Sequence, residues 1–157
     1  MKELKIIDVA AIQAYNNTDK AGQKLLTDLF GKEVFNQNIT DRVKTFEDAC
    51  EVLGLRPTDV LPLIPNAFSR EYEAITAHTK LLVIARALNE GWEPDWNNGN
   101  QVKYYPYFNM QNGFSLGSYG SGCQLSRVGS RLCFKSSSIA LYAGKQFLEL
   151  YKIYMTL

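Results

Sequence analysis

The hydrophobic pattern of this chain changes its period at Gly91, and that change restricts the fold more than any other feature of the sequence. Before Gly91, apolar residues recur at spacings of three and seven, which is typical of an amphipathic helix. After it, short aromatic and apolar runs alternate with Gly, Pro, Asn and Ser, which is typical of strands and turns. The sequence therefore predicts an α+β fold, in which an N-terminal helical part accompanies a small antiparallel sheet packed against helices.

A length of 157 residues fits one domain, with residues 1–91 as its mainly helical part and residues 92–157 as an aromatic sheet plus a C-terminal helix. The apolar fraction of 46% is sufficient for a core. The net charge of +1 argues against a non-specific nucleic-acid binder, which would carry a clear basic excess. The second part holds 13 of the 19 aromatic residues, and six basic against three acidic side chains. Any positive field therefore lies on the aromatic part.

Helix start and stop signals divide the first 44 residues. Residues 4–15 are ambiguous, with helix favoured after Asp8. Thr18 or Asp19 is placed to cap a helix that ends at Phe30. Residues 31–44 are expected to form a loop with at most a short turn.

The clearest helical signals lie between Thr45 and Gly91. The segment 45–48 has the pattern of a capping box and predicts a short helix over 46–53. Three prolines make residues 55–68 a connector with at most one helical turn. The longest helix is predicted over about 70–90, capped by Ser69. The stripe expected to be buried on that helix consists of Tyr72, Ile75, Leu82, Ala85 and Leu88, widened by Leu81 and Ile84.

After Gly91 the pattern predicts two strands and a last helix. Residues 102–108 form an edge or bulged strand, because Pro106 lacks an N–H group. The Gly- and Ser-rich segment 112–122 is expected to be a loop with a possible short strand at 114–116. Residues 127–135 predict the second strand, and residues 138–154 a helix in which Gly144 permits close packing on the sheet. The stripe expected to be buried on this helix consists of Ala140, Ala143, Phe147, Leu150, Tyr151 and Tyr154.

The cysteines and the single histidine predict no metal site and no cofactor. Cys50, Cys123 and Cys133 form no C-x-x-C pair, and His78 is the one histidine. Free cysteines and the absence of a signal-peptide pattern predict a reduced, cytoplasmic setting. No apolar run approaches the roughly 20 residues that span a bilayer, so no membrane partner is expected.

Catalysis stays open as an interpretation, although a non-enzymatic role is favoured. A thiol–imidazole pair of Cys133 and His78 would require the fold to bring the two residues together. In a dispersed active site, Glu93, Asp95 and His78 would be the first candidates for acid–base chemistry. Nothing in their spacing supports either arrangement.

Two sequence patterns indicate nucleic-acid recognition as an alternative to ordinary packing. Residues 46–63 have the spacing of a helix-turn-helix, but Pro62 would break the second helix and Arg56 is an isolated positive charge. The segment 131–134, followed by a Ser-capped helix, is similar to the third strand and second helix of an RNA-recognition motif. A sheet whose aromatic side chains stack on single-stranded bases is therefore the alternative function.

Several motifs in fixed order carry a resemblance that covers most of the chain from about residue 18. These are Trp-Glu-Pro-Asp-Trp at 92–96, Lys-Tyr-Tyr-Pro-Tyr-Phe at 103–108, Gly-Ser-Arg-Leu-Cys-Phe-Lys-Ser at 129–136 and Tyr-Ala-Gly-Lys-Gln-Phe at 142–147. The chain resembles a recurrent set of small proteins, without an assigned activity, that phages and mobile elements of gut bacteria encode. The resemblance implies a phage or prophage setting inside a bacterial cell, and it implies variation between Phe108 and Val128.

Together these observations predict a non-enzymatic intracellular binding or accessory protein of phage or prophage type. The expected partner is a host or phage protein, with nucleic acid as the other possibility. The sheet and the loop 109–127 are predicted to form the contact surface, because a variable loop on a steady scaffold commonly carries specificity. The six candidate binding residues are Tyr104, Tyr107, Phe114, Tyr119, Arg127 and Arg131.

Overall fold

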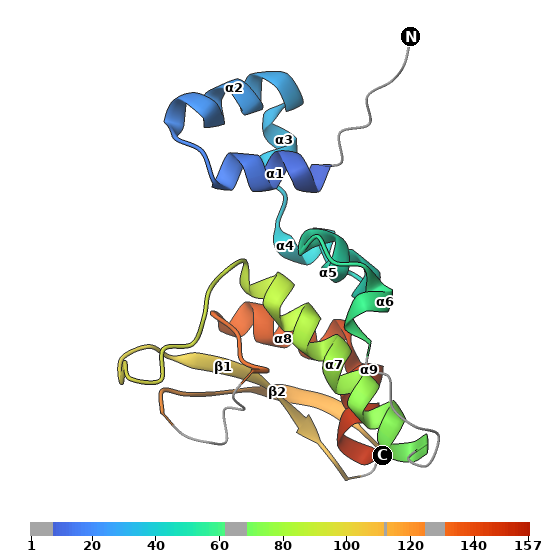
Figure 1. The fold of residues 1–157 in the computed structure, drawn as a ribbon. Helices are drawn as coiled ribbons and strands as arrows, with labels where there is room; N and C mark the ends of the chain where they lie inside the picture. Colours follow the sequence, from blue (N-terminus) through green and yellow to red (C-terminus); the bar gives the residue numbers. More distant parts are fainter. Residues whose placement is uncertain (1–7, 62–68, 112, 125–130) are drawn as a thin grey trace. The chain divides into compact units, whose positions relative to one another are not determined.

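The structure is a computed structural model that describes residues 8–61, 69–111, 113–124 and 131–157 (Figure 1). It divides into two compact units, Met1–Arg42 and Val43–Leu157. The sequence predicted one domain whose character changes after Gly91. The division after Arg42 arises because the long helix before Gly91 packs with the C-terminal helix of the second unit.

The first unit is a small group of helices. Asp19 caps its second helix as predicted, because the Asp19 carboxylate accepts a hydrogen bond from the Gly22 N–H over 2.9 Å. The predicted loop at 31–44 instead contains two short helices. The helices of this unit are α1 (Asp8–Asn16), α2 (Lys20–Phe30), α3 (Lys32–Phe35) and α4 (Ile39–Arg42).

Aromatic contacts hold α1, α2 and α3 together. The rings of Tyr15 and Phe35 stack with their centres 4.4 Å apart, and Phe30 meets Phe35 edge-on at 6.4 Å. The side chain of Gln23 also donates a hydrogen bond to the Tyr15 carbonyl. These contacts link the three helices through ring geometry and one polar bond across the turn.

The second unit contains the sheet and the longer helices. Helices α8 and α9 pack on one face of the hairpin, and α7 packs against α9 (Figure 1). This arrangement confirms the prediction of an α+β fold with a small antiparallel sheet packed against helices. Its elements are α5 (Phe46–Val52), α6 (Pro57–Val60), α7 (Ser69–Asn89), β1 (Lys103–Asn109), β2 (Ser115–Gly122), α8 (Ser137–Gln146) and α9 (Leu148–Thr156).

The Gly- and Ser-rich segment is a strand and not the predicted loop. It forms β2, which pairs antiparallel with β1 through most of its length and has one irregularity after Tyr107. Tyr105 pairs with Gly120, and a Cβ atom at Gly120 would lie 2.3 Å from the Tyr105 ring. Glycine at position 120 therefore lets the Tyr105 ring lie across the partner strand. The prediction of a loop took the glycines as turn residues and did not include this role.

The predicted strand at 127–135 is wrong for the part that the structure describes. Residues 125–130 lie outside the described residues, and residues 131–135 contain one isolated bridge. In that bridge the backbones of Tyr104 and Phe134 exchange two hydrogen bonds of 3.0 and 2.7 Å. The side chain of Asn89 on α7, described below, binds the backbone of Cys133 and Lys135 on the edge of this segment that faces away from Tyr104.

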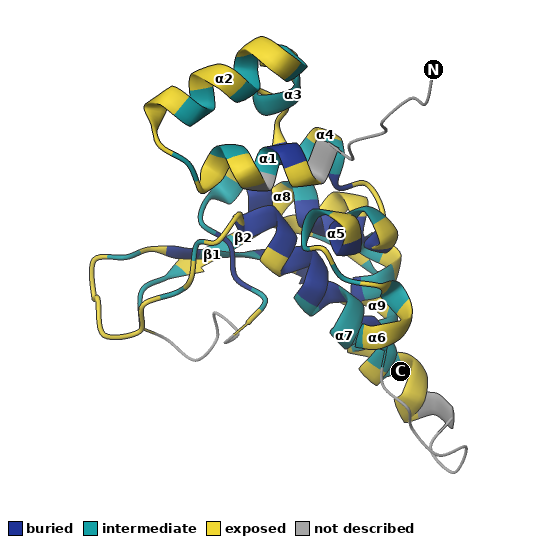
Figure 2. Cartoon of the chain, turned by 45° about the horizontal axis from the view of Figure 1, so that its top comes forward, coloured by how far each residue is buried: buried dark blue, intermediate teal, exposed yellow. Residues whose placement is uncertain are grey.

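Burial along α7 is concentrated in its later turns (Figure 2). Leu81, Ile84 and Leu88 are buried as predicted, whereas Tyr72 and Ile75 are 37% and 43% exposed. The periodic pattern extends over the whole helix, but the core residues that are described on α7 begin only at Ala77. The prediction of a buried stripe through Tyr72 and Ile75 is therefore wrong.

The last predicted helix is divided in two at Phe147, whose φ of −110° and ψ of 29° interrupt the helical path. Four residues of the predicted stripe are buried, and Leu150 and Tyr154 are partly exposed. Gly144 packs on the sheet as predicted, because a Cβ atom there would lie 2.6 Å from Leu116 and 2.7 Å from Pro106. The glycine thus sets how closely α8 approaches the hairpin.

Candidate binding groove

A groove of about 790 Å³ lies in the second unit, along the C-terminal half of α7. Its volume is within the range of small-molecule and side-chain binding sites. Three stretches that are distant in sequence form it, within residues 53–60, 82–96 and 131–133, and we call it the Trp–Arg groove. Its lining residues are Leu53, Leu55, Val60, Leu82, Val83, Arg86, Asn89, Trp92, Glu93, Pro94, Trp96, Arg131 and Cys133.

Leu53 and Leu55 reach the groove because of the way α5 ends. Gly54 takes a left-handed conformation with φ of 65°, which side chains with a Cβ atom adopt only under strain. The N–H of Leu55 then donates to the Cys50 carbonyl over 2.8 Å, which closes the helix end and fixes the direction of the chain. Leu53 and Leu55 are thereby placed in the groove lining.

Two arginines give the groove its positive character. Arg86 on α7 and Arg131 are both exposed, and neither forms an ion pair or a side-chain hydrogen bond with any residue that the structure describes. Among the described lining residues, Glu93 is the one acidic residue. Guanidinium groups carry five N–H donors in a planar fork that suits carboxylate and phosphate. The groove therefore offers an anionic ligand donors that no described residue occupies.

Both tryptophans of the chain line this groove. Trp96 is held by Lys103, whose ammonium group lies 5.2 Å from the centre of the indole ring. The Lys103 residue is fully buried, and its Nζ atom donates to the carbonyls of Asp95 and Gln101 over 2.5 and 2.9 Å. Lys103 thus ties the turn that follows Trp92 onto strand β1, and it positions one wall of the groove.

Gln101 braces the same turn from its other end. Its side-chain carbonyl accepts a hydrogen bond from the Asp95 N–H over 2.7 Å, and its amide donates to the Glu93 carbonyl over 3.4 Å. Asp95 also accepts a hydrogen bond from the Asn97 N–H. Because the turn is bonded at several points, its tryptophans do not depend on a ligand for their placement.

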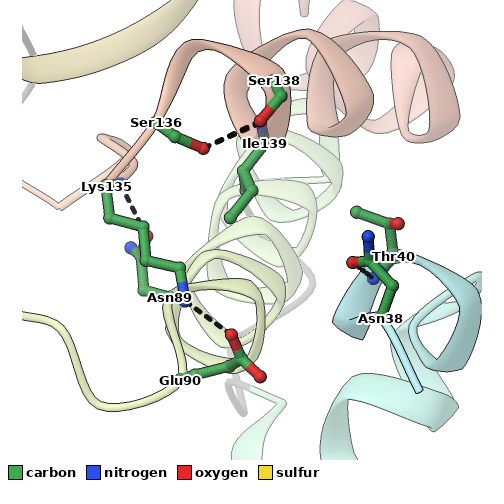
Figure 3. Close-up of polar contacts among 8 residues, drawn as sticks. All are labelled: Asn38, Thr40, Asn89, Glu90, Lys135, Ser136, Ser138 and Ile139. Atoms are coloured by element: carbon green, nitrogen blue, oxygen red, sulfur yellow. Dashed lines mark hydrogen bonds and ion pairs between the residues drawn. The ribbon is translucent and has the colours of Figure 1, made fainter. Parts of the chain in front are cut away.

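Asn89, at the end of α7, holds the lining segment that contains Cys133 and leads to Lys135 (Figure 3). Its side chain donates to the Cys133 carbonyl over 2.9 Å and accepts from the Lys135 N–H over 3.1 Å. Lys135 in turn forms an ion pair with Glu90. Asn89 therefore takes the place of a hydrogen-bonded neighbouring strand on the edge of this segment that faces away from β1.

The predicted acid–base and nucleophilic candidates are not gathered here. Burial raises the pKa of the Cys133 thiol, with opposition from its own backbone and from the Lys103 charge, so the thiol stays protonated and weakly nucleophilic. His78 stacks on Tyr154 at 4.7 Å and is not part of the lining, and burial lowers its pKa. Of Glu93, Asp95 and His78, the groove takes only Glu93.

The predicted binding residues lie in different places. Tyr104 and Tyr119 meet edge-on at 5.9 Å on the sheet face that carries Pro106. Tyr107 points to the opposite face and is 58% exposed, and Phe114 stacks on Phe108 at 4.8 Å. Arg131 lines the Trp–Arg groove, and Arg127 lies outside the described residues.

Sequence reasoning did not assign Trp92, Trp96 and Arg86 to a site. The two tryptophans of the chain flank Pro94 directly after the longest helix, and this spacing was the available signal. Arg86 gave no such signal, because its place depends on which face of α7 the other segments leave open.

The segment with helix-turn-helix spacing, residues 46–63, has a second helix of a single turn. In the described part of residues 46–63, helix α6 covers only Pro57–Val60. One helical turn is too short to lie along a major groove and contact several bases. The resulting turn contributes Leu55 and Val60 to the groove lining instead.

Within the described ranges, no helix has the length and apolar character that crossing a bilayer requires, and no cluster of His, Cys, Asp and Glu side chains could hold a metal ion. Comparison with known proteins gives no match: no family model, no curated protein and no solved structure is significantly similar to this chain.

Proposed function

We propose that this chain is a non-enzymatic binding module of a phage or prophage, and that the Trp–Arg groove is its contact surface. The observation that carries the proposal is that one groove with a braced turn holds both tryptophans and two arginines that pair with no described residue. Tryptophan and arginine are the residue types that most often dominate binding energy at protein interfaces. A protein partner is therefore the favoured ligand.

The chemistry of the groove supports binding over bond-breaking. Its thiol is held protonated by burial, and Glu93 has no second carboxylate or imidazole beside it in the lining. Acid–base catalysis requires an acid and a base with different pKa values, each within hydrogen-bond reach of the reacting group. The arginines and tryptophans, by contrast, need no partner group in order to bind a ligand.

Single-strand binding on the sheet is the second candidate. Tyr107 favours it, because this ring is 58% exposed on the sheet face opposite to Phe108, which packs against Tyr151 of α9. The alternation of side chains places Tyr104 and Phe108 on the other face, so the open face has fewer rings for stacking than the sequence predicted.

The proposal is tested by capture from bacterial lysate on the immobilised full chain. Three proteins are compared: the wild type, the double variant Arg86→Ala/Arg131→Ala, and Lys145→Ala, which changes an exposed residue of α8 outside the groove. Quantitative mass spectrometry is run with and without nuclease. We expect a protein retained by the wild type and by Lys145→Ala, but lost from the double variant, in both conditions. Equal retention by all three proteins, or retention only without nuclease, contradicts the proposal.

A further inference from the structure

We infer that the Trp–Arg groove recognises a short acidic peptide segment that carries one large apolar side chain. The inference rests on the proposed function and adds the chemistry of the partner. The groove lining holds two chemically different sets of side chains, aliphatic and cationic, and each set restricts the ligand separately.

The aliphatic part of the lining favours an aliphatic or aromatic anchor. Five aliphatic side chains, from the α5–α6 region and from α7, belong to it: Leu53, Leu55, Val60, Leu82 and Val83. These side chains offer no hydrogen-bond donor or acceptor, so a polar ligand group placed against them would lose its water without replacement. A buried Leu- or Phe-like side chain meets no such penalty and gains from leaving water.

The cationic part of the lining favours carboxylates. Arg86 and Arg131 have no acidic partner among the described residues, and Glu93 balances only one of the two charges. A carboxylate accepts two parallel hydrogen bonds from a guanidinium group, so Asp or Glu beside the anchor would match these donors. Trp92 and Trp96 line the same groove, and an indole N–H group is a further donor type.

A nucleic acid fits the same groove less well. Retaining a single strand requires several phosphate contacts, and the groove supplies two arginines within a chain of net charge +1. Bases carry polar edges that the five aliphatic residues cannot satisfy. Single-stranded nucleic acid is therefore the competing outcome of the test.

The protein carries its own reporter for this site. The sequence has two tryptophans, and both line the groove. Their indole N–H signals in a ¹⁵N–¹H spectrum consequently report on groove occupancy without labels elsewhere. A ligand that binds another part of the chain would leave those two signals in place.

The experiment selects displayed random dodecapeptides on the immobilised full chain. The consensus peptide and a short oligothymidylate are then titrated into ¹⁵N-labelled protein. We expect the selected peptides to combine an apolar residue with Asp or Glu, and the consensus peptide to shift both indole signals. Its affinity should fall by at least about tenfold in Arg86→Ala/Arg131→Ala and stay unchanged in Lys145→Ala. The charge-reversed variant Arg86→Glu/Arg131→Glu, altered at exposed positions, should select basic peptides.

Three outcomes overturn the inference. Selected peptides without acidic residues that still shift the indole signals would leave the proposed function standing and refute the ligand chemistry. Indole shifts caused by oligothymidylate, with no response to the peptide, would assign the groove to nucleic acid. Failure to select any peptide, while the lysate capture retains a groove-dependent protein, would show that recognition does not use a short linear segment.

Discussion

The side-chain amide of Asn89 donates to the backbone carbonyl of Cys133 over 2.9 Å, although 44 residues separate the two in sequence. The same side chain accepts from the N–H of Lys135. One buried residue of α7 thus replaces a strand partner and fixes the segment that carries Arg131. The position of Arg131 therefore depends on Asn89, which also lines the groove.

Replacement of Asn89 by alanine should destabilise the protein. The change leaves the Cys133 carbonyl and the Lys135 N–H without their partner, and we expect a loss of about 1–3 kcal/mol in the free energy of unfolding. Urea denaturation followed by far-UV circular dichroism measures it. Asn97→Ala, at an exposed turn position, is the control and should change stability by less than about 0.5 kcal/mol. Equal stability of the two variants would refute the assigned role of Asn89.

Replacement of Lys103 by methionine should release Trp96. The methionine fills a similar volume but cannot donate to the carbonyls of Asp95 and Gln101, so the turn loses its attachment to β1. We expect a stability loss of about 1 kcal/mol, because the variant also removes a buried charge. Fluorescence is recorded in a Trp92→Phe background, where Trp96 alone emits. Its maximum should move to longer wavelength, and an unshifted maximum would contradict the assigned role of Lys103.

Gly144→Ala tests how closely α8 approaches the hairpin. Alanine favours helix over glycine by about 1 kcal/mol, but the new methyl group would lie within 2.7 Å of both Leu116 and Pro106. We expect the clash to prevail and stability to fall by about 1–3 kcal/mol. Thermal unfolding measures the change, with Lys145→Ala as a control on the exposed side of the same helix. A Gly144→Ala protein more stable than the wild type would show that Leu116 and Pro106 move aside at little cost, and it would contradict this expectation.

The single histidine should make stability depend on pH. Burial lowers the pKa of His78 in the folded state below its ordinary value of 6.5, so the unfolded chain binds the proton more readily. Stability should therefore decrease as the pH falls below 6.5 and level off below the folded-state pKa. Denaturation at a series of pH values between about 7.5 and 5.5 measures this slope. His78→Phe, which can keep the stacking on Tyr154, should remove most of the slope, and an unchanged slope would assign it to other groups.

The amino-acid sequence by itself determined the local elements. The cap of α2 at Asp19, the capping box at Thr45 and Asp48, and the single turn of α6 were all predicted, because their hydrogen bonds and steric restrictions act within about four residues. Gly144 was also assigned correctly from its position inside a helical pattern.

Only the tertiary structure decided the groove and the true extent of the sheet. Lining residues come from segments around Leu53, Arg86, Trp96 and Arg131, and no spacing rule relates positions so far apart. The Gly-rich β2 pairs with β1, and the Tyr105 ring of β1 lies over Gly120. Such contacts depend on which surfaces meet after the helices pack, and the free energy that selects them comes from burial across the whole unit rather than from any short stretch.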